Sequence, residues 1–210
     1  MQVLSRIFKP FIEKKKTMET VIIKYNAGNI RSVDFALRRL GVEAVITDDH
    51  DRIRNADKVI FPGVGAASST MKHLKARKLD ALLRELTQPV LGICLGQQLM
   101  CNRSEEGDTP CIGLFDEPVL KFPPEDKVPH MGWNQLVKPK GALFEGVAEG
   151  SYVYFVHSYY VPVCDDTAAT CHYIRDFSAA LQRGNFYATQ FHPEKSGLTG
   201  QRILQNFLSL

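Results

Sequence analysis

The segment from Pro89 to Met100 most restricts the folds open to this chain. An apolar run, Pro89-Val90-Leu91, leads into Gly92-Ile93-Cys94-Leu95-Gly96, and a helix-compatible stretch follows. This pattern is typical of a nucleophile elbow, in which a strand ends, the chain turns sharply at one residue and a helix begins. Glycine is expected two positions either side of Cys94 because the tight turn leaves no room for a Cβ atom there. At a helix N-terminus, unpaired N–H groups and the helix dipole favour the thiolate form of this cysteine.

The order of apolar segments predicts an α/β fold. Strands are expected at 21–23, 42–47, 59–61 and 90–94, helices at 30–40, 68–86 and 198–210, and a polar turn at 48–51. Strands and helices that alternate in this way form a parallel sheet covered on both faces. After residue 113, aromatic and β-branched runs such as Tyr152-Val153-Tyr154-Phe155-Val156 indicate antiparallel hairpins. We therefore expect a three-layer, mostly parallel sheet with helices on both faces and antiparallel hairpin additions in the C-terminal half.

Charge and composition set limits on domains, partners and compartment. Five basic side chains and one acidic side chain fall in residues 1–17, so residues 18–210 are nearly neutral and no basic nucleic-acid surface is expected. No apolar run approaches the roughly 20 residues that cross a bilayer, so no membrane span is expected. The five cysteines show no CxxC pair and indicate reduced thiols in a cytoplasmic protein. We expect one domain, 18–210. Residues 1–17 are expected to be a poorly ordered extension or the result of an upstream start codon; the alternative is a membrane-surface helix, which Pro10 would interrupt.

A cysteine nucleophile needs a base, and the base needs an orienting partner. Phe191-His192-Pro193-Glu194 supplies both in four residues. Pro193 disfavours helix at the preceding residue, so the segment is expected to be extended, with His192 and Glu194 projecting to the same side. The carboxylate would then hold one imidazole nitrogen while the other faces Cys94, which is the logic of a catalytic triad.

The same chemistry needs donors for a developing oxyanion. The backbone N–H groups of Leu95 and of Val64 or Gly65, in the turn Pro62-Gly63-Val64-Gly65, are suitable. The other four cysteines lack an elbow and are expected to fill the core. No metal-site spacing and no phosphate loop is present in the sequence, so no metal or cofactor is expected. His130 and His157 lie among unusual aromatics and have no assigned role.

The motifs together resemble a known family. Gly-Ile-Cys-Leu-Gly-Gln-Gln at 92–98 with His192-Pro193-Glu194 is similar to the class I, triad-type glutamine amidotransferases. The resemblance narrows to the glutaminase subunits of imidazole glycerol phosphate synthases through four further segments: 25–29 (YNAGN), 61–65 (FPGVG), 130–134 (HMGWN) and 154–159 (YFVHSY).

The resemblance implies roles for particular residues. Cys94 would attack the side-chain amide of L-glutamine to give a thioester and ammonia, with His192 moving protons and Glu194 orienting it. Gly65, Gln98 and the Ser158-Tyr159 backbone would hold the amino-acid end of the substrate. Ammonia would pass to a separate cyclase subunit, forming a heterodimer, for the synthesis of imidazole glycerol phosphate and an aminoimidazole carboxamide ribotide. Family positions at or near that interface correspond to Gly28, Asn29, Trp133, Tyr154 and Lys195.

Several alternatives stay open from the sequence. The ammonia acceptor could differ, as in a pyridoxal phosphate synthase; the chain could be a non-catalytic scaffold that kept the fold, or a cysteine peptidase on the same fold. Trp133 could be a buried core indole instead of an interface anchor. Lys24 and Asn26 depart from the family pattern, which often has Asp and Gly there.

Overall fold

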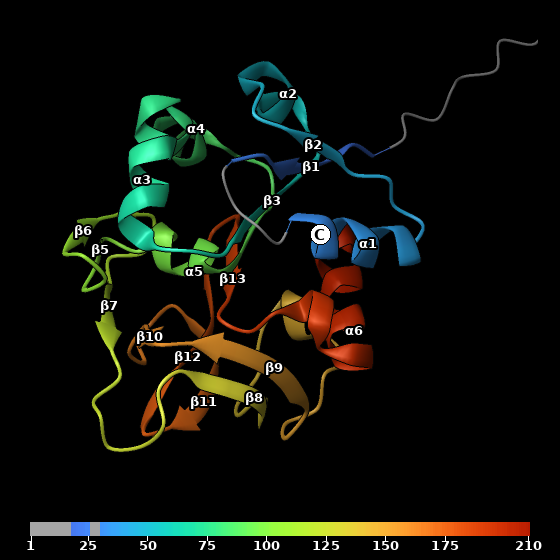
Figure 1. Ribbon diagram of the computed structural model, residues 1–210. Helices are drawn as coiled ribbons and strands as arrows, with labels where there is room; N and C mark the ends of the chain where they lie inside the picture. The colour runs from blue at the N-terminus through green and yellow to red at the C-terminus, as the bar shows by residue number, and fades with distance from the viewer. Residues whose placement is uncertain (1–17, 26–29) are drawn as a thin grey trace, which may run out of the picture.

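A mostly parallel sheet forms the centre of the molecule. The computed structural model describes residues 18–25 and 30–210 of the chain, and in this part seven strands pair in the order β11-β12-β13-β4-β3-β1-β2 (Figure 1). The strands are β1 (Thr20–Ile23), β2 (Val45–Thr47), β3 (Lys58–Gly63), β4 (Val90–Cys94), β11 (Thr167–Tyr173), β12 (Arg175–Arg183) and β13 (Phe186–Thr189). Strands β13, β4, β3, β1 and β2 are parallel, while β11 and β12 extend the sheet in antiparallel fashion. The predicted sheet is confirmed.

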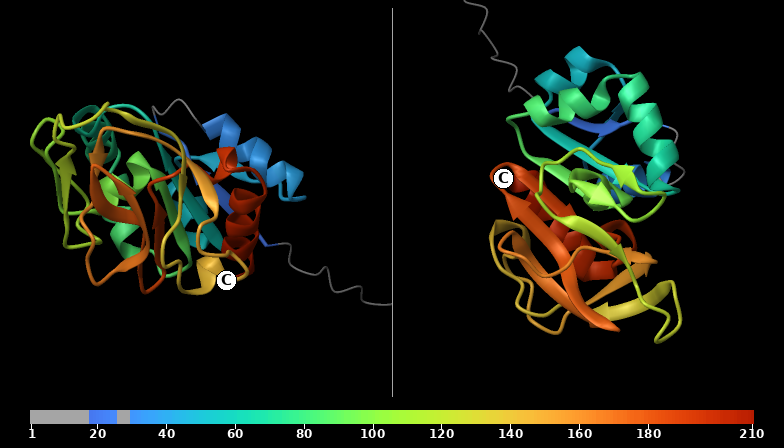
Figure 2. Two further views of the ribbon diagram at one scale, coloured as in Figure 1. Left: turned by 90° about the horizontal axis from the view of Figure 1, so that it is seen from below. Right: turned by 90° about the vertical axis from the view of Figure 1, so that its left-hand side faces the viewer.

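Helices cover both faces of this sheet, as Figures 1 and 2 show. One face carries α2 (His50–Asn55), α3 (Ala67–Ala76), α4 (Leu79–Glu85) and α5 (Leu95–Met100), and the other carries α1 (Ile30–Arg39) and α6 (Gly197–Ser209). Strand β1 sends Val21 and Ile23 into the first core and Ile22 into the second. The parallel strands are therefore continuous apolar runs because both of their faces are buried.

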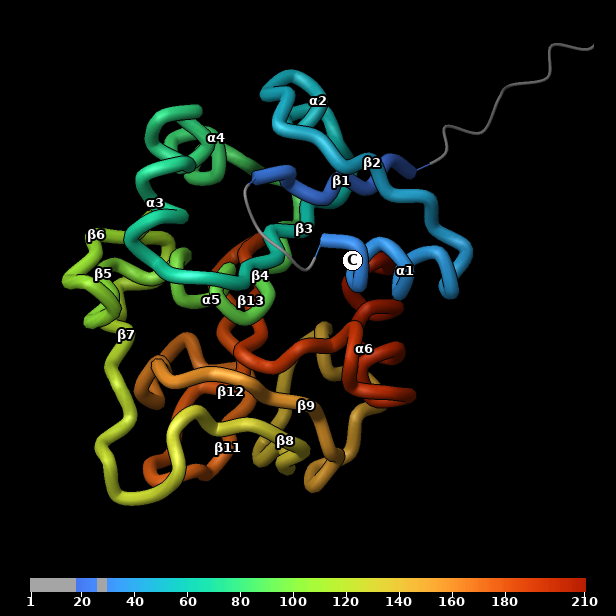
Figure 3. Tube along the Cα trace, in the orientation of Figure 1, coloured from blue at the N-terminus to red at the C-terminus, as the bar shows by residue number. Residues whose placement is uncertain are grey.

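The C-terminal half adds antiparallel pieces, as predicted. Strands β8 (His130–Gln135) and β9 (Tyr152–His157) form a two-stranded sheet. A small sheet combines β10 (Tyr159–Tyr160), β7 (Pro118–Lys121), β5 (Arg103–Ser104) and β6 (Thr109–Pro110), and single 3₁₀ turns occur at η1 (Ala142–Phe144) and η2 (Pro193–Lys195). Figure 3 shows the chain leaving β13 and passing beside β9 on its way to α6, which brings the segment after β13 next to the β8–β9 hairpin.

Three predicted boundaries were wrong. The strand expected at 42–47 is shorter because the N–H of Val42 donates to the Leu37 carbonyl and, with Gly41 at φ 78°, closes the end of α1. The turn expected at 48–51 instead begins α2, where the Asp49 carboxylate accepts from the Arg52 N–H and caps the helix. The single helix expected at 68–86 is two helices, α3 and α4, which break at Lys78.

Lys78 offers a test of local strain. It adopts the left-handed conformation, with φ 54° and ψ 23°, which disfavours a residue that carries a Cβ atom. Lys78→Gly should therefore raise the free energy of unfolding by about 0.5–1 kcal/mol. Lys75→Gly, inside α3, should lower it by about 1 kcal/mol. Urea unfolding of both variants measures the difference, and equal destabilisation of the two would contradict this account of the break.

No helix among the described residues is long and apolar enough to cross a membrane. The residues expected to form an N-terminal extension, 1–17, and the predicted interface positions Gly28 and Asn29 lie outside the described part of the chain, as does Asn26.

Candidate active site

The chain turns sharply at Cys94, between the end of β4 and the start of α5. This residue has φ 55° and ψ −109°, a conformation that is rare for any residue other than glycine. Strain of this kind persists only where the surrounding structure imposes it, and it is found at nucleophile elbows. The side chain is 7% exposed. The structure thus places Cys94 in the strand-to-helix turn that its sequence context predicts.

The neighbouring glycines allow this turn to pack. A Cβ atom on Gly96 would lie 2.1 Å from the Phe61 carbonyl oxygen, and one on Gly63 would lie 2.5 Å from the Gly96 nitrogen. A Cβ atom on Gly92 would meet the Gln97 nitrogen at 3.1 Å. The absence of these atoms lets α5 approach β3 and β4 closely, so that Gly63 pairs directly with Cys94 across the sheet.

His192 and Glu194 meet in the interior. The Nδ1–H of His192 donates to Oε1 of Glu194 at 2.8 Å, and the two side chains are 2% and 0% exposed. The backbone is extended at His192 (φ −97°, ψ 97°), but Pro193 begins the 3₁₀ turn η2. The expectation that the whole segment is extended was therefore wrong. The turn brings the two side chains together because it folds the carboxylate back toward the ring.

The protonation of His192 is set by its two neighbours. Burial lowers the pKa of His192, but the nearby Cys94 sulfur and the Glu194 carboxylate outweigh burial and hold the pKa above its usual range. Within the described residues, Nε2 of His192 has no hydrogen-bond partner of normal geometry. This nitrogen is therefore available to exchange a proton with a group bound beside Cys94.

A cavity of about 370 Å³ opens beside the cysteine. It brings together most of the residues that the sequence singled out, namely Cys94, His192, Val64, Gly65, Leu95, Gln98, Ser158 and Tyr159. Gly65 has φ 109°, which suits glycine, and Leu95 is the first residue of α5, where N–H groups lack partners within the helix. The cavity therefore has a nucleophile, a base and backbone groups from the turn on its walls.

Sequence reasoning missed one polar side chain at this site. The Nε2 of Gln190 lies 3.8 Å from Sγ of Cys94, and its Oε1 accepts from Nε2 of Gln98 at 2.9 Å. Gln98 also donates to the Tyr159 carbonyl at 3.0 Å. The signal was available, because Gln190 precedes His192 by two residues and so projects to the same side of an extended chain.

The other four cysteines have a different environment. Cys101, Cys111 and Cys171 are buried, Cys164 is half-buried, and none of the four lines the cavity beside Cys94. Burial raises the pKa of Cys111 to about 11 and that of Cys171 to about 12, so these thiols stay protonated at neutral pH. Among the described residues, no group of three or more His, Cys, Asp or Glu side chains could hold a metal ion.

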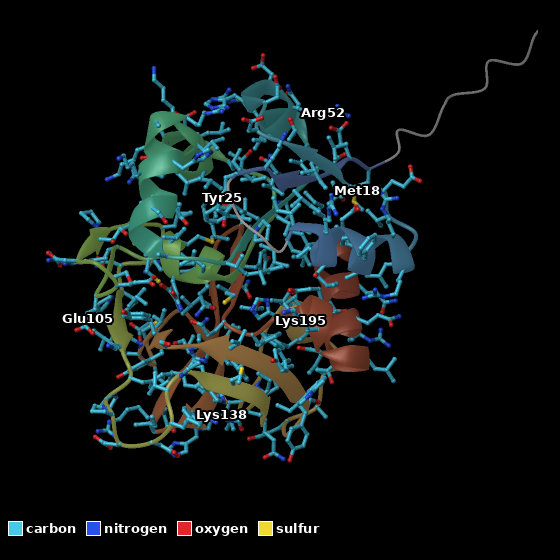
Figure 4. All side chains as sticks on the ribbon, in the orientation of Figure 1. Met18, Tyr25, Arg52, Glu105, Lys138 and Lys195 are labelled. Atoms are coloured by element: carbon cyan, nitrogen blue, oxygen red, sulfur yellow. The ribbon has the colours of Figure 1, made fainter. Side chains whose placement is uncertain are left out.

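Trp133, Tyr154 and Lys195 lie together on the surface near the site. The Trp133 and Tyr154 ring centroids are 6.0 Å apart, and Nζ of Lys195 lies 5.8 Å from the centroid of the Tyr154 ring. Lys195, labelled in Figure 4, belongs to the turn η2 that also carries Glu194. Trp133 is 55% exposed, which excludes a buried core indole. The backbone of Tyr154 reaches the site directly, because its carbonyl accepts from the His192 N–H at 2.9 Å.

His130 and His157 form a second buried pair, and they make stability depend on pH. Burial lowers the pKa of His157 to about 3 and that of His130 to about 4. Below about pH 6.5 the unfolded chain binds protons at both positions while the folded chain does not, so stability falls with falling pH. The loss between about pH 7 and pH 5 should be about 2 kcal/mol for each histidine. The raised pKa of His192 gives stability that is complete well below about pH 6.5 and is lost as the pH rises, so it offsets about 1 kcal/mol of the combined loss between pH 7 and pH 5.

Urea unfolding at the two pH values measures this loss. His157→Asn should remove about half of it, while His172→Asn, at an exposed position in β11, should leave it unchanged. A loss of equal size in His157→Asn and wild type would contradict a neutral buried pair.

Comparison with known proteins agrees with this geometry. The family model described as glutamine amidotransferase class-I matches residues 21–210. The subunit HisH of imidazole glycerol phosphate synthase from Bacteroides thetaiotaomicron is 64% identical over 196 residues, covering 92% of this chain and 100% of that protein. The HisH subunit from Colwellia psychrerythraea is 45% identical, covering 91% and 93%.

Solved structures support the fold. A crystal structure of a glutamine amidotransferase aligns with a TM-score of 0.70 at 20% identity, covering 90% of this chain and 97% of that one. PurLQS from Thermotoga maritima aligns with a TM-score of 0.68 at 17% identity, covering 91% and 97%. The family model and the HisH relatives each span nine-tenths of the chain or more. The chain therefore belongs to the class-I glutamine amidotransferases, and within them to the family of imidazole glycerol phosphate synthase subunits HisH.

Proposed function

We propose that this chain is the glutaminase subunit of an imidazole glycerol phosphate synthase, with Cys94, His192 and Glu194 as its catalytic triad. One observation carries the proposal: a strained cysteine at a strand-to-helix turn shares a cavity with a buried histidine that a carboxylate holds at 2.8 Å. The relatives named as HisH subunits, which match almost the whole chain, support the same role in histidine biosynthesis.

The first half of the reaction forms a covalent intermediate. The sulfur of Cys94 attacks the side-chain amide carbon of glutamine, a C–S bond forms, and the carbonyl oxygen becomes an oxyanion. The backbone N–H of Leu95, with that of Val64 or Gly65, stabilises this charge. His192 takes the proton of the Cys94 thiol and gives it to the amide nitrogen, the C–N bond breaks, and ammonia leaves behind a glutamyl thioester.

The second half returns the enzyme to its starting state. Water attacks the thioester carbon while His192 takes one of its protons. The C–S bond then breaks to release glutamate, and His192 returns the proton to the sulfur of Cys94. Throughout both halves, Glu194 keeps the His192 ring oriented and stabilises its charged form. No cofactor takes part in these steps.

The walls of the cavity supply the substrate contacts. Gly65, Gln98 and the Ser158-Tyr159 backbone hold the amino-acid end of glutamine. The Gln98 amide nitrogen is already bound to the Tyr159 carbonyl and to Gln190, so Gln98 acts chiefly by fixing the neighbouring segment.

The partner is a cyclase subunit that receives ammonia. Ammonia is largely protonated in neutral water and then no longer nucleophilic, so a route closed to water preserves it. We assign the cyclase to the surface formed by Trp133, Tyr154 and Lys195. The family positions Gly28 and Asn29 are predicted to contact it as well. Trp and Tyr side chains at a surface are frequent interface anchors. The five free cysteines fit a cytoplasmic protein.

Coupling to the partner tests this assignment. Glutamate release should be slow for the isolated chain and should rise when the cyclase and its nucleotide ligand are added, because the partner completes the site. The measurement is glutamate release with the chain alone, with the cyclase, and with both cyclase and nucleotide. A high rate without partner that does not change on adding the cyclase would contradict the proposed coupling.

A further inference from the structure

Two buried histidines connect the β8–β9 hairpin to the cavity. His130 and His157 are 4% and 6% exposed and sit opposite each other in the hairpin. Nδ1 of His130 lies 3.0 Å from Nε2 of His157, and Nδ1 of His157 lies 2.8 Å from the Tyr159 carbonyl oxygen. At the other end, Nδ2 of Asn134 lies 3.3 Å from Nε2 of His130 and also donates to the His172 carbonyl at 3.0 Å. Neither ring takes part in the steps described above.

The carbonyl at one end fixes the direction of every hydrogen bond. A carbonyl oxygen only accepts, so Nδ1 of His157 carries the hydrogen and, in a neutral ring, Nε2 is the acceptor. Nδ1 of His130 must then donate to it, and Nε2 of His130 accepts from the Asn134 amide. Burial keeps both rings neutral, and a proton on His157 would also face the charge of His192. The three residues thus form one relay with a single direction, from Asn134 to Tyr159.

The end of the relay belongs to the cavity wall. The Tyr159 carbonyl accepts from His157 and also from Gln98, whose amide nitrogen continues to Gln190 beside the sulfur of Cys94. A carbonyl held by two donors has little freedom to turn. Loss of one donor would therefore release the segment that carries Ser158 and Tyr159.

We propose that Asn134, His130 and His157 are positioning residues for glutamine binding, because their one-directional relay holds the Tyr159 carbonyl, and with it Gln98, in the binding geometry. This inference rests on the proposed function, since it assumes that the cavity beside Cys94 binds glutamine.

Reversing the relay tests the inference without changing its shape. Asn134→Asp places a carboxylate oxygen, which only accepts, beside Nε2 of His130. At about pH 8, where the rings are neutral, His130 must then donate to Asp, and His157 turns a bare Nδ1 toward the Tyr159 carbonyl. The KM for glutamine should rise about tenfold, the effect of one lost hydrogen bond, while kcat changes less. Asn134→Ala likewise removes the donor to His130 and to the His172 carbonyl, but it leaves the direction set by Tyr159, so its KM should rise less than that of Asn134→Asp.

A second pair of variants acts at the other end. Asn can present its amide nitrogen near the position of Nδ1, so His157→Asn should keep KM closer to wild type than His157→Leu, which has no donor. His172→Asn serves as the unaffected control, because it changes only an exposed side chain that pairs with Asp176 and keeps the backbone carbonyl that accepts from Asn134. All assays use the complex with the cyclase and its nucleotide. Synthesis from added ammonia should be unchanged in every variant, which shows that the complex is intact.

Ring nitrogen NMR of histidine-labelled protein reads the relay directly. Wild type should show the hydrogen on Nδ1 of both His130 and His157. A spectrum with the hydrogen on Nε2 of His157 would overturn the inference. Kinetics would also overturn it if Asn134→Asp and Asn134→Ala had equal KM values and His157→Leu and His157→Asn had equal KM values as well. If Cys94→Ala still used glutamine, the proposed function would fail instead. Loss of glutamine use in Cys94→Ala with unchanged KM in the relay variants would overturn the relay alone.

Discussion

Cys94→Ala is expected to lower glutamine-dependent synthesis by about 10⁴- to 10⁶-fold, the range seen when a triad nucleophile is removed. Alanine leaves no atom that can bond to the amide carbon, so only weak residual hydrolysis from the oxyanion donors persists. The turn itself should survive, because the substitution only shortens a side chain that is already accommodated at φ 55°. The measurement is kcat for glutamate release in the complex with the cyclase and its nucleotide.

Two comparisons separate lost chemistry from lost structure. Cys164→Ala changes a half-buried thiol outside the cavity and should keep wild-type kcat. Synthesis from added ammonia should be retained in Cys94→Ala, since that reaction bypasses glutamine hydrolysis. Retention of glutamine-dependent synthesis in Cys94→Ala would instead favour a scaffold without catalysis.

Glu194→Gln is expected to lower kcat about 10³- to 10⁴-fold with a much smaller change in KM. The amide is nearly the same shape as the carboxylate, but it carries no charge to stabilise a protonated His192. It can also present its amide nitrogen to Nδ1 of His192, which then has to accept. The ring would take the wrong tautomer, with hydrogen on the nitrogen that must receive the Cys94 proton.

The pH dependence gives this prediction a second measurement. The raised pKa of His192 has two opposed causes, burial that lowers it and the Cys94 sulfur and Glu194 carboxylate that raise it. Removal of the carboxylate should therefore lower the pKa of His192, shifting the pH profile of kcat/KM. Glu149→Gln, at an exposed position, should change neither kcat nor the profile. A Glu194→Gln variant with wild-type kcat would show that this carboxylate does not orient the base.

The parts of the fold that could be predicted are those with a local physical cause. The elbow could be predicted because Gly92 and Gly96 flank Cys94 at the spacing that close packing against β3 and Gln97 requires. The parallel strands could be predicted because burial on both faces makes them continuous apolar runs. The triad was predicted from two separate motifs, one around Cys94 and one around His192 and Glu194. The parallel pairing of β13 with β4 brings these motifs to the same end of the sheet.

The parts that could not be predicted depend on contacts with no local signature. Nothing in the sequence around Lys78 marks the left-handed residue that divides α3 from α4. The acidic run before α2 was interpreted as a turn, because aspartate is favoured both in turns and at helix N-caps and the sequence does not distinguish the two. The Gln98–Gln190 contact joins residues 92 positions apart and appears only when β13 pairs with β4.

Mass spectrometry of the acid-quenched complex during turnover of glutamine can detect a glutamyl thioester on Cys94. We expect a mass increase of one glutamyl group on the peptide that contains Cys94, and no such increase in Cys94→Ala. The adduct should accumulate if His192 is replaced by a residue that activates water poorly but still permits acylation. Rapid glutamate release with the adduct on another cysteine, or with glutamine use intact in Cys94→Ala, would contradict catalysis through this thioester.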